Sequence, residues 1–212
     1  RSVSRGLGDV YKRQILPVLH KEGERARVLE YCDALKAELS AQTYAGRPVR
    51  VEMDRRDLRG GEKVWSWVKK GVPVRAEVGP RDVAQNAVFA ARRDDGSKKP
   101  VPRAEFVATI ADTLKSVQDS LFERAKKYRD DNTVGISSKE DFYSFFTPVN
   151  AGKPEIHGGF AMAYYDGSRE VEEALKNDLK VTVRCIPLEG AGKGKCIFTG
   201  REGVKAVFAK SY

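Results

Sequence analysis

The sequence predicts an α/β protein with a mixed sheet of about five strands covered by helices, followed by a smaller α/β domain. Two observations carry this prediction. Two kinds of segment alternate along the chain. One kind is short and apolar or alternating, as strands are, and in the other the apolar side chains recur at helical spacing. The chain also has 212 residues, a length that fits one large domain or two small ones.

The first domain is expected over residues 15–130, with the order β-α-β-α-β-β-α. Its first segment, residues 15–19, is apolar throughout, as a buried strand is. In the second segment, Val28, Cys32 and Leu35 have the spacing of one face of an amphipathic helix. Gly71 ends the next helix, and Pro102 begins a long one, where its missing N–H costs nothing. The predicted strands are 15–19, 49–53, 72–78 and 87–92, the predicted helices are 22–41, 62–70 and 102–129, and a turn is predicted at 94–99.

A linker over residues 131–137 and a smaller domain over residues 138–212 are expected to follow. Ser137 and Glu140 have the spacing of a capping box, which predicts that a helix begins at residue 138. The predicted helices are 138–146 and 168–179, and the predicted strands are 160–164, 181–187, 195–198 and 204–209.

Residues 1–14 do not fit this pattern, because they have no apolar periodicity and no initiator methionine. The string GLGDVYKRQ resembles a translated sequencing adapter. We therefore expect residues 1–14 to be a non-native tail and exclude them from the prediction of the fold. The alternative is a genuine basic arm that binds nucleic acid.

The chain is basic, with 39 Lys and Arg against 30 Asp and Glu and a formal charge of +9. Residues 59–103 alone contain 11 bases and 5 acids, so an RNA-facing surface is expected there. Three cysteines without a C-x-x-C spacing indicate no disulfide framework. The chain has no run of about 18 apolar residues and no apolar signal segment, so we expect a cytoplasmic protein without a membrane span.

Residues that could form a complete active site are scarce. Neither His20 nor His157 lies in a metal-binding motif. The segment GAGKGKC at 190–196 resembles a phosphate-binding loop, but Glu189 replaces its first glycine and Cys196 replaces the hydroxyl that binds magnesium. The sequence therefore favours a binding function over a catalytic one.

A group of aromatic, basic and acidic residues between 65 and 82 is more informative. RNA that is read by sequence is usually single-stranded, with bases stacked on flat side chains and hydrogen-bonded along their edges. Arginine donates bidentately to guanine, and an aspartate can accept from a base. The candidates are Trp65, Trp67, Lys69, Lys70, Arg75, Arg81 and Asp82. The alternative is that one tryptophan belongs to the core and the cations form a solvated face.

Several longer motifs resemble a single family, in order along the chain. They are GGEKVWSWVKKGVPVRAEVGPRD (60–82), VFAARRDDGSKKPVPRAEF (88–106), GGFAMAYYDG (158–167) and VTVRCIPLE (181–189). These motifs are similar to the anticodon-binding and C-terminal domains of class II prolyl-tRNA synthetases of the archaeal and eukaryotic type, which some bacteria share.

The resemblance implies that the chain is a fragment of a proline–tRNA ligase, an aminoacyl-tRNA synthetase. It would bind the anticodon stem-loop of tRNA(Pro) and position it for prolylation, while a missing N-terminal catalytic domain binds proline, ATP and Mg. No catalytic residue is then expected in this chain, and the parent enzyme is expected to be a homodimer. The alternative is a free-standing RNA-binding module of the same fold that acts in trans.

The resemblance also implies individual site residues. By position in the family's motifs, Arg75, Arg81 and Asp82 read anticodon guanines, and we expect Lys69, Lys70 and Trp67 to contact RNA beside them. Val68 departs from the family, which has an acid there, because a valine cannot accept a hydrogen bond from guanine. Tyr212, at the C-terminus, is implied to reach toward the catalytic domain.

Many members of the family hold zinc in the C-terminal domain through four cysteines. The corresponding positions here are Asp166, Val171, Cys196 and Thr199. One thiolate out of four cannot build the closed tetrahedral site of a structural zinc ion. We therefore expect no metal and no other cofactor in this chain.

Overall fold

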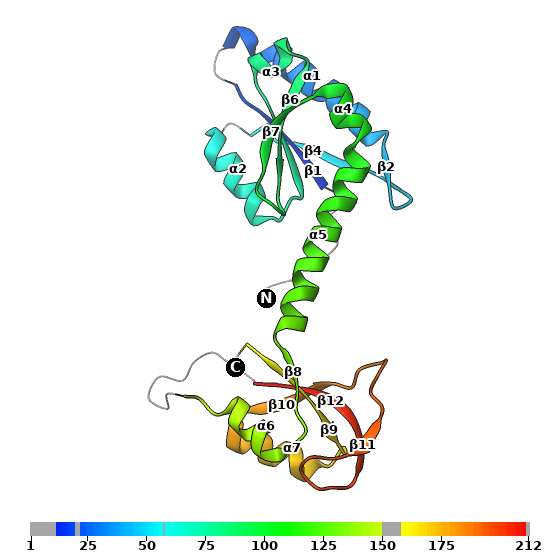
Figure 1. Ribbon diagram of the computed structural model, residues 1–212. Coiled ribbons are helices and arrows are strands. Elements are labelled where there is room, and N and C mark those ends of the chain that lie inside the picture. Colours follow the sequence, from blue (N-terminus) through cyan, green and yellow to red (C-terminus); the bar gives the residue numbers. More distant parts are fainter. Residues whose placement is uncertain (1–11, 20–21, 57, 150–157, 211–212) are drawn as a thin grey trace. The chain divides into compact units, whose positions relative to one another are not determined.

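A computed structural model describes the chain except for residues 1–11, 20–21, 57, 150–157 and 211–212. The chain divides into two compact units, Arg1–Glu123 and Arg124–Tyr212, which are described separately (Figure 1).

The first unit contains a five-stranded mixed sheet. Its order is β4 (Arg50–Met53), β1 (Lys12–Pro17), β5 (Val74–Val78), β6 (Ala87–Arg92) and β7 (Lys98–Pro102). Strand β1 runs parallel to both of its neighbours, whereas β5, β6 and β7 pair antiparallel. A short hairpin of β2 (Thr43–Tyr44) and β3 (Arg47–Pro48) stands outside this sheet. The predicted fold class is confirmed.

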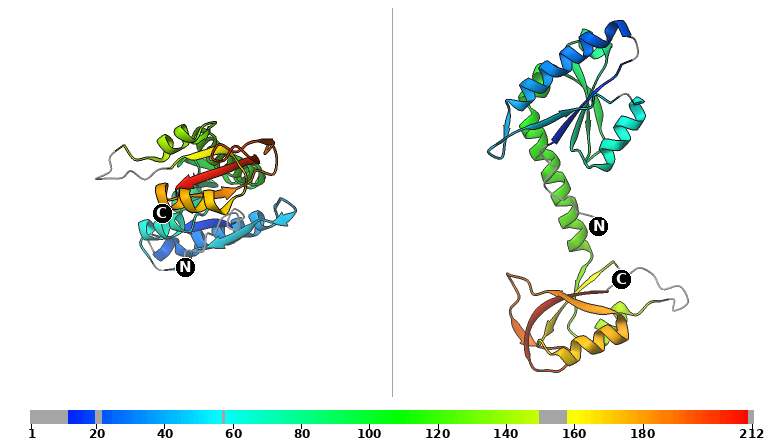
Figure 2. Two further views of the ribbon diagram at one scale, coloured as in Figure 1. Left: turned by 90° about the horizontal axis from the view of Figure 1, so that it is seen from below. Right: turned by 180° about the vertical axis from the view of Figure 1, so that it is seen from behind.

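Helices cover both faces of this sheet, because successive strand residues point to opposite sides. Ile15 and Val74 pack against α1 (Glu22–Ser40), α4 (Arg103–Ala108) and α5 (Ile110–Asp131) in the larger core. Leu16, on the opposite face, packs with Trp67 of α2 (Gly60–Lys69). Figure 2 shows α2 on the side of the sheet away from α1 and α5. A short helix, α3 (Pro80–Ala84), follows β5 and contacts α1 and β6.

Three features of the first unit differ from the prediction. Strand β1 begins at Lys12, so the last three residues of the expected foreign tail pair with β4, and Gln14 is buried. The predicted turn at 94–99 overlaps β7, whose prolines are tolerated because β7 is an edge strand. The predicted helix 102–129 is divided at Thr109, where φ is −97° and ψ is 4°.

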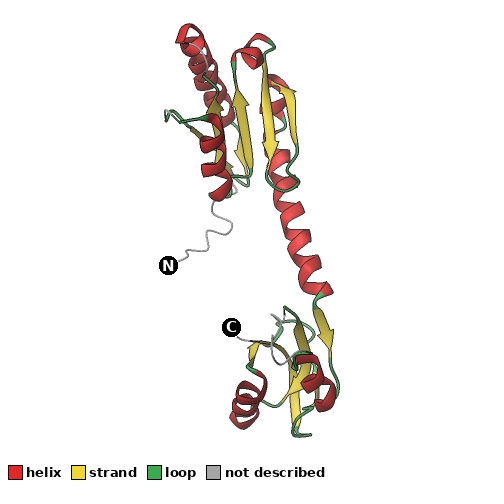
Figure 3. Ribbon diagram, turned by 90° about the vertical axis from the view of Figure 1, so that its left-hand side faces the viewer, coloured by secondary structure: helices red, strands yellow, loops and turns green. Residues whose placement is uncertain are grey.

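The second unit contains a sheet with the order β10 (Val181–Cys185), β12 (Glu202–Lys210), β9 (Phe160–Tyr165) and β8 (Thr133–Gly135). Strand β11 (Lys193–Lys195) also pairs with β12. Helices α6 (Lys139–Phe146) and α7 (Arg169–Leu179) pack on one face of the sheet (Figure 3). Phe142 lies at the centre of this core, with its ring 5.0 Å from that of Phe146 and 5.1 Å from that of Phe208.

Three predictions for this unit need correction. The strand predicted at residues 195–198 lies at Lys193–Lys195 (β11), and residues 197–199 form a turn. The expected linker 131–137 contains β8, which pairs in parallel with β9. The helix cap is Ser138 rather than Ser137, because α6 begins one residue later than predicted. The backbone N–H of Asp141 donates to Ser138 Oγ over 3.0 Å.

Candidate nucleic-acid interface

Helix α2 carries both tryptophans of the sequence and exposes them to different degrees. Trp67 is 9 % exposed and packs on Leu16 and Val72, and its Nε1–H donates to Asp54 Oδ2 over 2.7 Å. The ammonium group of Lys70 lies 4.0 Å from the centroid of the Trp67 ring. Trp67 is therefore a core residue, and Trp65, which is 63 % exposed, is the tryptophan free to stack on a base.

The carboxylate of Asp54 anchors the part of α2 that contains Ser66 and Trp67. Arg56 donates to it through Nε over 2.8 Å and through a terminal nitrogen over 2.6 Å, and also donates to Ser66 Oγ over 2.8 Å. The hydrogen bond from Arg56 lowers the pKa of Asp54, and the bond from Trp67 adds to this against the effect of burial. Asp54 is therefore ionised at neutral pH.

Arg75 lies in β5 on the sheet face that carries α2, since its neighbours Val74 and Ala76 point into the opposite core. It is 6 % exposed, and its Nε–H has no hydrogen-bond partner within the part of the chain that the structure describes. Burial lowers the pKa of Arg75, while the nearby Glu77 carboxylate opposes that change. A buried N–H group without an acceptor is costly to the fold, which makes Arg75 a candidate for a ligand contact.

Arg81 and Asp82 occupy α3, beyond the opposite end of β5. Arg81 is exposed, and no ion pair or hydrogen bond of its side chain occurs among the described residues. Asp82 accepts a hydrogen bond from the Gly79 N–H over 2.8 Å through Oδ2, so it caps its own helix. No hydrogen bond to the other carboxylate oxygen, Oδ1, is found within the part of the chain that the structure describes.

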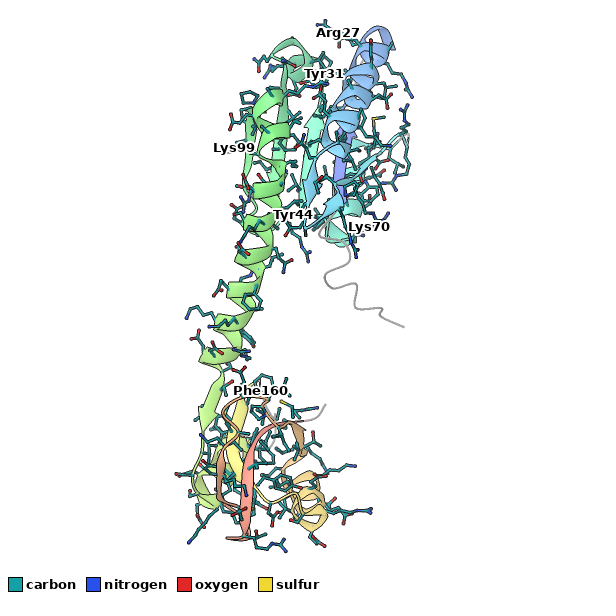
Figure 4. All side chains as sticks on the ribbon, turned by 90° about the vertical axis from the view of Figure 1, so that its right-hand side faces the viewer. Arg27, Tyr31, Tyr44, Lys70, Lys99 and Phe160 are labelled. Atoms are coloured by element: carbon teal, nitrogen blue, oxygen red, sulfur yellow. The ribbon has the colours of Figure 1, made fainter. Side chains whose placement is uncertain are left out.

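The predicted site residues therefore form two groups rather than one cluster. Lys69 and Lys70 lie at the C-terminal end of α2 and are exposed, and Arg75 is at the start of β5. Tyr31 marks the end of the unit that carries α3, because its hydroxyl donates to the carbonyl of Ala87, just after α3. Figure 4 shows Lys70 at the other end of the unit from Tyr31. A five-residue strand spans roughly 16 Å, so the two groups could contact different nucleotides of one loop.

Of the four positions that correspond to zinc ligands in the family, the fold brings Asp166 and Thr199 into direct contact. The side chain of Asp166 is 4 % exposed and accepts from Thr199 Oγ1 and from Arg201 Nε, each over 2.7 Å, and from the Ser168 N–H over 3.1 Å. Burial opposes ionisation of Asp166, but these hydrogen bonds outweigh it and lower the pKa of the carboxyl group. Cys196 is buried, and Val171 packs at the edge of the core.

Metal-binding groups are few in the part of the chain that the structure describes. No cluster of three or more His, Cys, Asp or Glu residues with the geometry to hold an ion is found there. The absence of zinc stays a prediction. Tyr212, which was expected to contact another domain, lies outside the described residues. None of the described helices combines the length and the apolarity needed to cross a bilayer.

Two family models match the chain, one in each unit. The model described as "Anticodon binding domain" matches residues 13–113, and the model described as "Prolyl-tRNA synthetase, C-terminal" matches residues 152–212.

The relatives found are bacterial proteins named proline–tRNA ligase. The chain is 52 % identical over 205 residues to "Proline--tRNA ligase 2" of Anaeromyxobacter dehalogenans, and 49 % identical over 203 residues to the protein of Protochlamydia amoebophila. It is 45 % identical over 200 residues to the protein of Rhodopirellula baltica. These alignments cover 93 % of this chain but only 39–40 % of each relative.

Proposed function

Because the chain matches the C-terminal part of prolyl-tRNA synthetases, an anticodon-binding domain followed by that family's C-terminal domain, we propose that it binds the anticodon stem-loop of tRNA(Pro). The observation that carries this proposal is Arg75. Its Nε–H is buried without a hydrogen-bond partner among the described residues, at the start of β5, and the exposed Lys69 and Lys70 end the preceding helix α2. An arginine fork in this position suits the two acceptors on the edge of a guanine.

The other site residues have complementary roles in this proposal. Arg81 supplies a second free guanidinium, and Asp82 Oδ1 accepts from a base while Oδ2 stays on Gly79. Trp65 offers an exposed ring for stacking, a role the sequence assigned to Trp67. Val68 is 37 % exposed and has no polar atom on its side chain, so the base beside it is read by shape or by neighbouring residues.

For the whole protein we propose the activity of a proline–tRNA ligase. The remainder of that protein would activate proline with ATP and Mg and transfer it to the tRNA, as a cytoplasmic homodimer of the archaeal and eukaryotic type. This chain would position the tRNA and supply no catalytic residue. Tyr212 would then contact the catalytic domain, so deleting residues 211–212 from the full-length protein should lower aminoacylation and leave anticodon binding unchanged.

The test is the affinity of this chain for two stem-loop RNAs, measured by fluorescence anisotropy. One RNA carries the anticodon UGG, and in the other both guanines are replaced. The wild type should prefer UGG, and Arg81→Ala should lower that preference by about 1–3 kcal/mol, the value of one good bidentate contact. The control Lys99→Ala should weaken both RNAs equally and flatten the salt dependence. Equal binding of the two RNAs by the wild type would refute the proposal.

A further inference from the structure

A second group of cations lies in the first unit, at the end of the sheet where β1 and β5 stop and α3 with Arg81 begins. A cavity of about 390 Å³ opens where β1 ends, between the segment that follows β4 and the first turn of α2. Five basic side chains line it, and none of the described residues in its wall is acidic. The five are Arg25, Arg55, Arg56, Arg59 and Lys63.

Lys63 is the most informative of these residues. It is 6 % exposed and faces the cavity from the same side of α2 as Trp67, four residues further along. Its ammonium group has no hydrogen bond or ion pair within the part of the chain that the structure describes. A cation in the wall of a cavity without a counter-charge among the described residues favours an anionic ligand, which would supply that counter-charge.

The acidic partners near the cavity account for only two of its five cations. Asp33 accepts from Arg55 over 2.6 Å and 2.8 Å, and Asp54 holds Arg56. Arg25, Arg59 and Lys63 have no such partner among the described residues. Among the described residues, the cations that line the cavity therefore outnumber their acidic partners.

The N-terminus of α2 adds to the positive electrostatic potential of the cavity. Arg59 occupies the N-cap position, and no side chain caps the helix there. A Cβ atom built on Gly60 or on Gly61 would meet no atom within 4 Å, so the backbone of the first turn is open to a ligand. The first N–H groups of a helix and its dipole both favour an anion.

We propose that this cavity binds a phosphate group of the RNA backbone, as a contact separate from the residues that read bases. The inference rests on the proposed function. Helix α2 links the two regions, because Lys63 faces the cavity and Lys70 lies roughly 10 Å further along the helix axis. One RNA strand can therefore reach both. Backbone phosphates fix the position of an RNA and carry no sequence information.

The test compares Lys63→Met and Arg59→Met with the control Lys115→Met, which removes one charge from an exposed position on α5. The affinities of the full chain for the UGG stem-loop and for the guanine-replaced stem-loop are measured at several salt concentrations. Lys63→Met and Arg59→Met should each weaken both RNAs by about tenfold. Each should also reduce the salt slope by about 0.7–0.9, with the preference for UGG unchanged. Arg59 is exposed, so its variant keeps the test valid if Lys63→Met fails to fold.

Four outcomes would overturn the inference. If both variants behave as the control does while the wild type still prefers UGG, the cavity does not contact RNA and the proposed function stands. If they bind RNA normally but only the wild type is stabilised by inorganic pyrophosphate, the site takes a free anion. If they change the preference between the loops, the cavity reads bases. If they spare RNA binding but lower aminoacylation in the full-length protein, an acidic protein segment occupies the cavity. A wild type without any preference for UGG would instead refute the proposed function.

Discussion

The two units handle their buried charges differently. In the second unit, the buried carboxylate of Asp166 is satisfied by Thr199, Ser168 and Arg201. In the first unit, the buried carboxylate of Asp54 is satisfied in the same way by Arg56 and Trp67, but the buried side chains of Arg75 and Lys63 have no hydrogen-bond or ion-pair partner among the described residues.

This difference separates a structural role from a binding role. A buried charge with several partners is explained by the stability of the fold alone. A buried charge without partners costs stability, and its presence points to a ligand that the folded chain must meet. By this criterion Arg75 and Lys63 are the candidates for a binding role, whereas Asp54 and the Asp166 network are expected to be structural.

The largest effect is expected for Asp166→Ala. The substitution leaves Thr199 and the Ser168 N–H without their acceptor and removes the ion pair with Arg201, so the second unit should lose about 2–4 kcal/mol. Native-state hydrogen exchange of the β9 and β12 amides measures this loss. The control Glu173→Ala, which removes an exposed pair with Arg169, should cost less than about 0.5 kcal/mol. Similar losses for the two variants would contradict a structural role for Asp166.

Arg75→Met should give the opposite pattern in the first unit. Its unfolding free energy should stay constant or rise, because an apolar side chain replaces a buried arginine whose Nε–H has no hydrogen-bond partner among the described residues. The preference for UGG should fall by about 1–3 kcal/mol. Arg75→Lys keeps the charge but loses the fork, so it should lose most of the discrimination as well. A large drop in the melting temperature of Arg75→Met would assign Arg75 to the fold.

Acid should destabilise the first unit through Asp54. Its folded-state pKa is lowered below the unfolded value near 3.9, first by the hydrogen bond from Arg56. The stabilisation is therefore complete above the unfolded pKa and is lost as the pH falls toward the folded pKa. Urea titrations followed by tryptophan fluorescence report on this unit, since both tryptophans lie in α2. Between about pH 4 and pH 2 the wild type should lose about 1–2 kcal/mol more than Asp54→Asn does. Parallel curves would show that Asp54 does not cause the change.

The smallest effect is expected for metal removal. The purified chain should contain no stoichiometric zinc by mass spectrometry of the metal content, and a chelator should leave its melting temperature unchanged. The Asp166 carboxylate is engaged by Thr199 and Arg201, and Val171 has no donor atom. Equimolar zinc together with unfolding by the chelator would contradict this prediction.

The sequence predicted the alternation of strands and helices well, because the spacing of apolar residues within each segment differs between a strand and a helix. It could not place the edge strand β7, because the two prolines of Lys98–Pro102 favour a turn and only the position at the edge of the sheet tolerates them. Helical periodicity also left open which tryptophan is buried. That choice depends on the packing of α2 against Leu16 of β1 and on Asp54, which are distant in the sequence.

The candidate site was predictable only residue by residue. The family motifs gave Arg75, Arg81 and Asp82, but not that they lie at opposite ends of β5. The cavity around Lys63 was missed, because its cations come from α1, from the segment after β4 and from α2. The pairing of Asp166 with Arg201 likewise joins residues whose contact depends on the folded second unit.

The central position of β1 has a consequence for biosynthesis. Both of its neighbours, β4 and β5, are parallel to it and come later in the chain, after α1 and α2 respectively. During translation, β1 therefore leaves the ribosome with two unpaired edges, and neither can be covered until those later segments have been made. Such long-range parallel pairing is slow to form. The nascent first unit should thus be a substrate for chaperones until β5 has emerged.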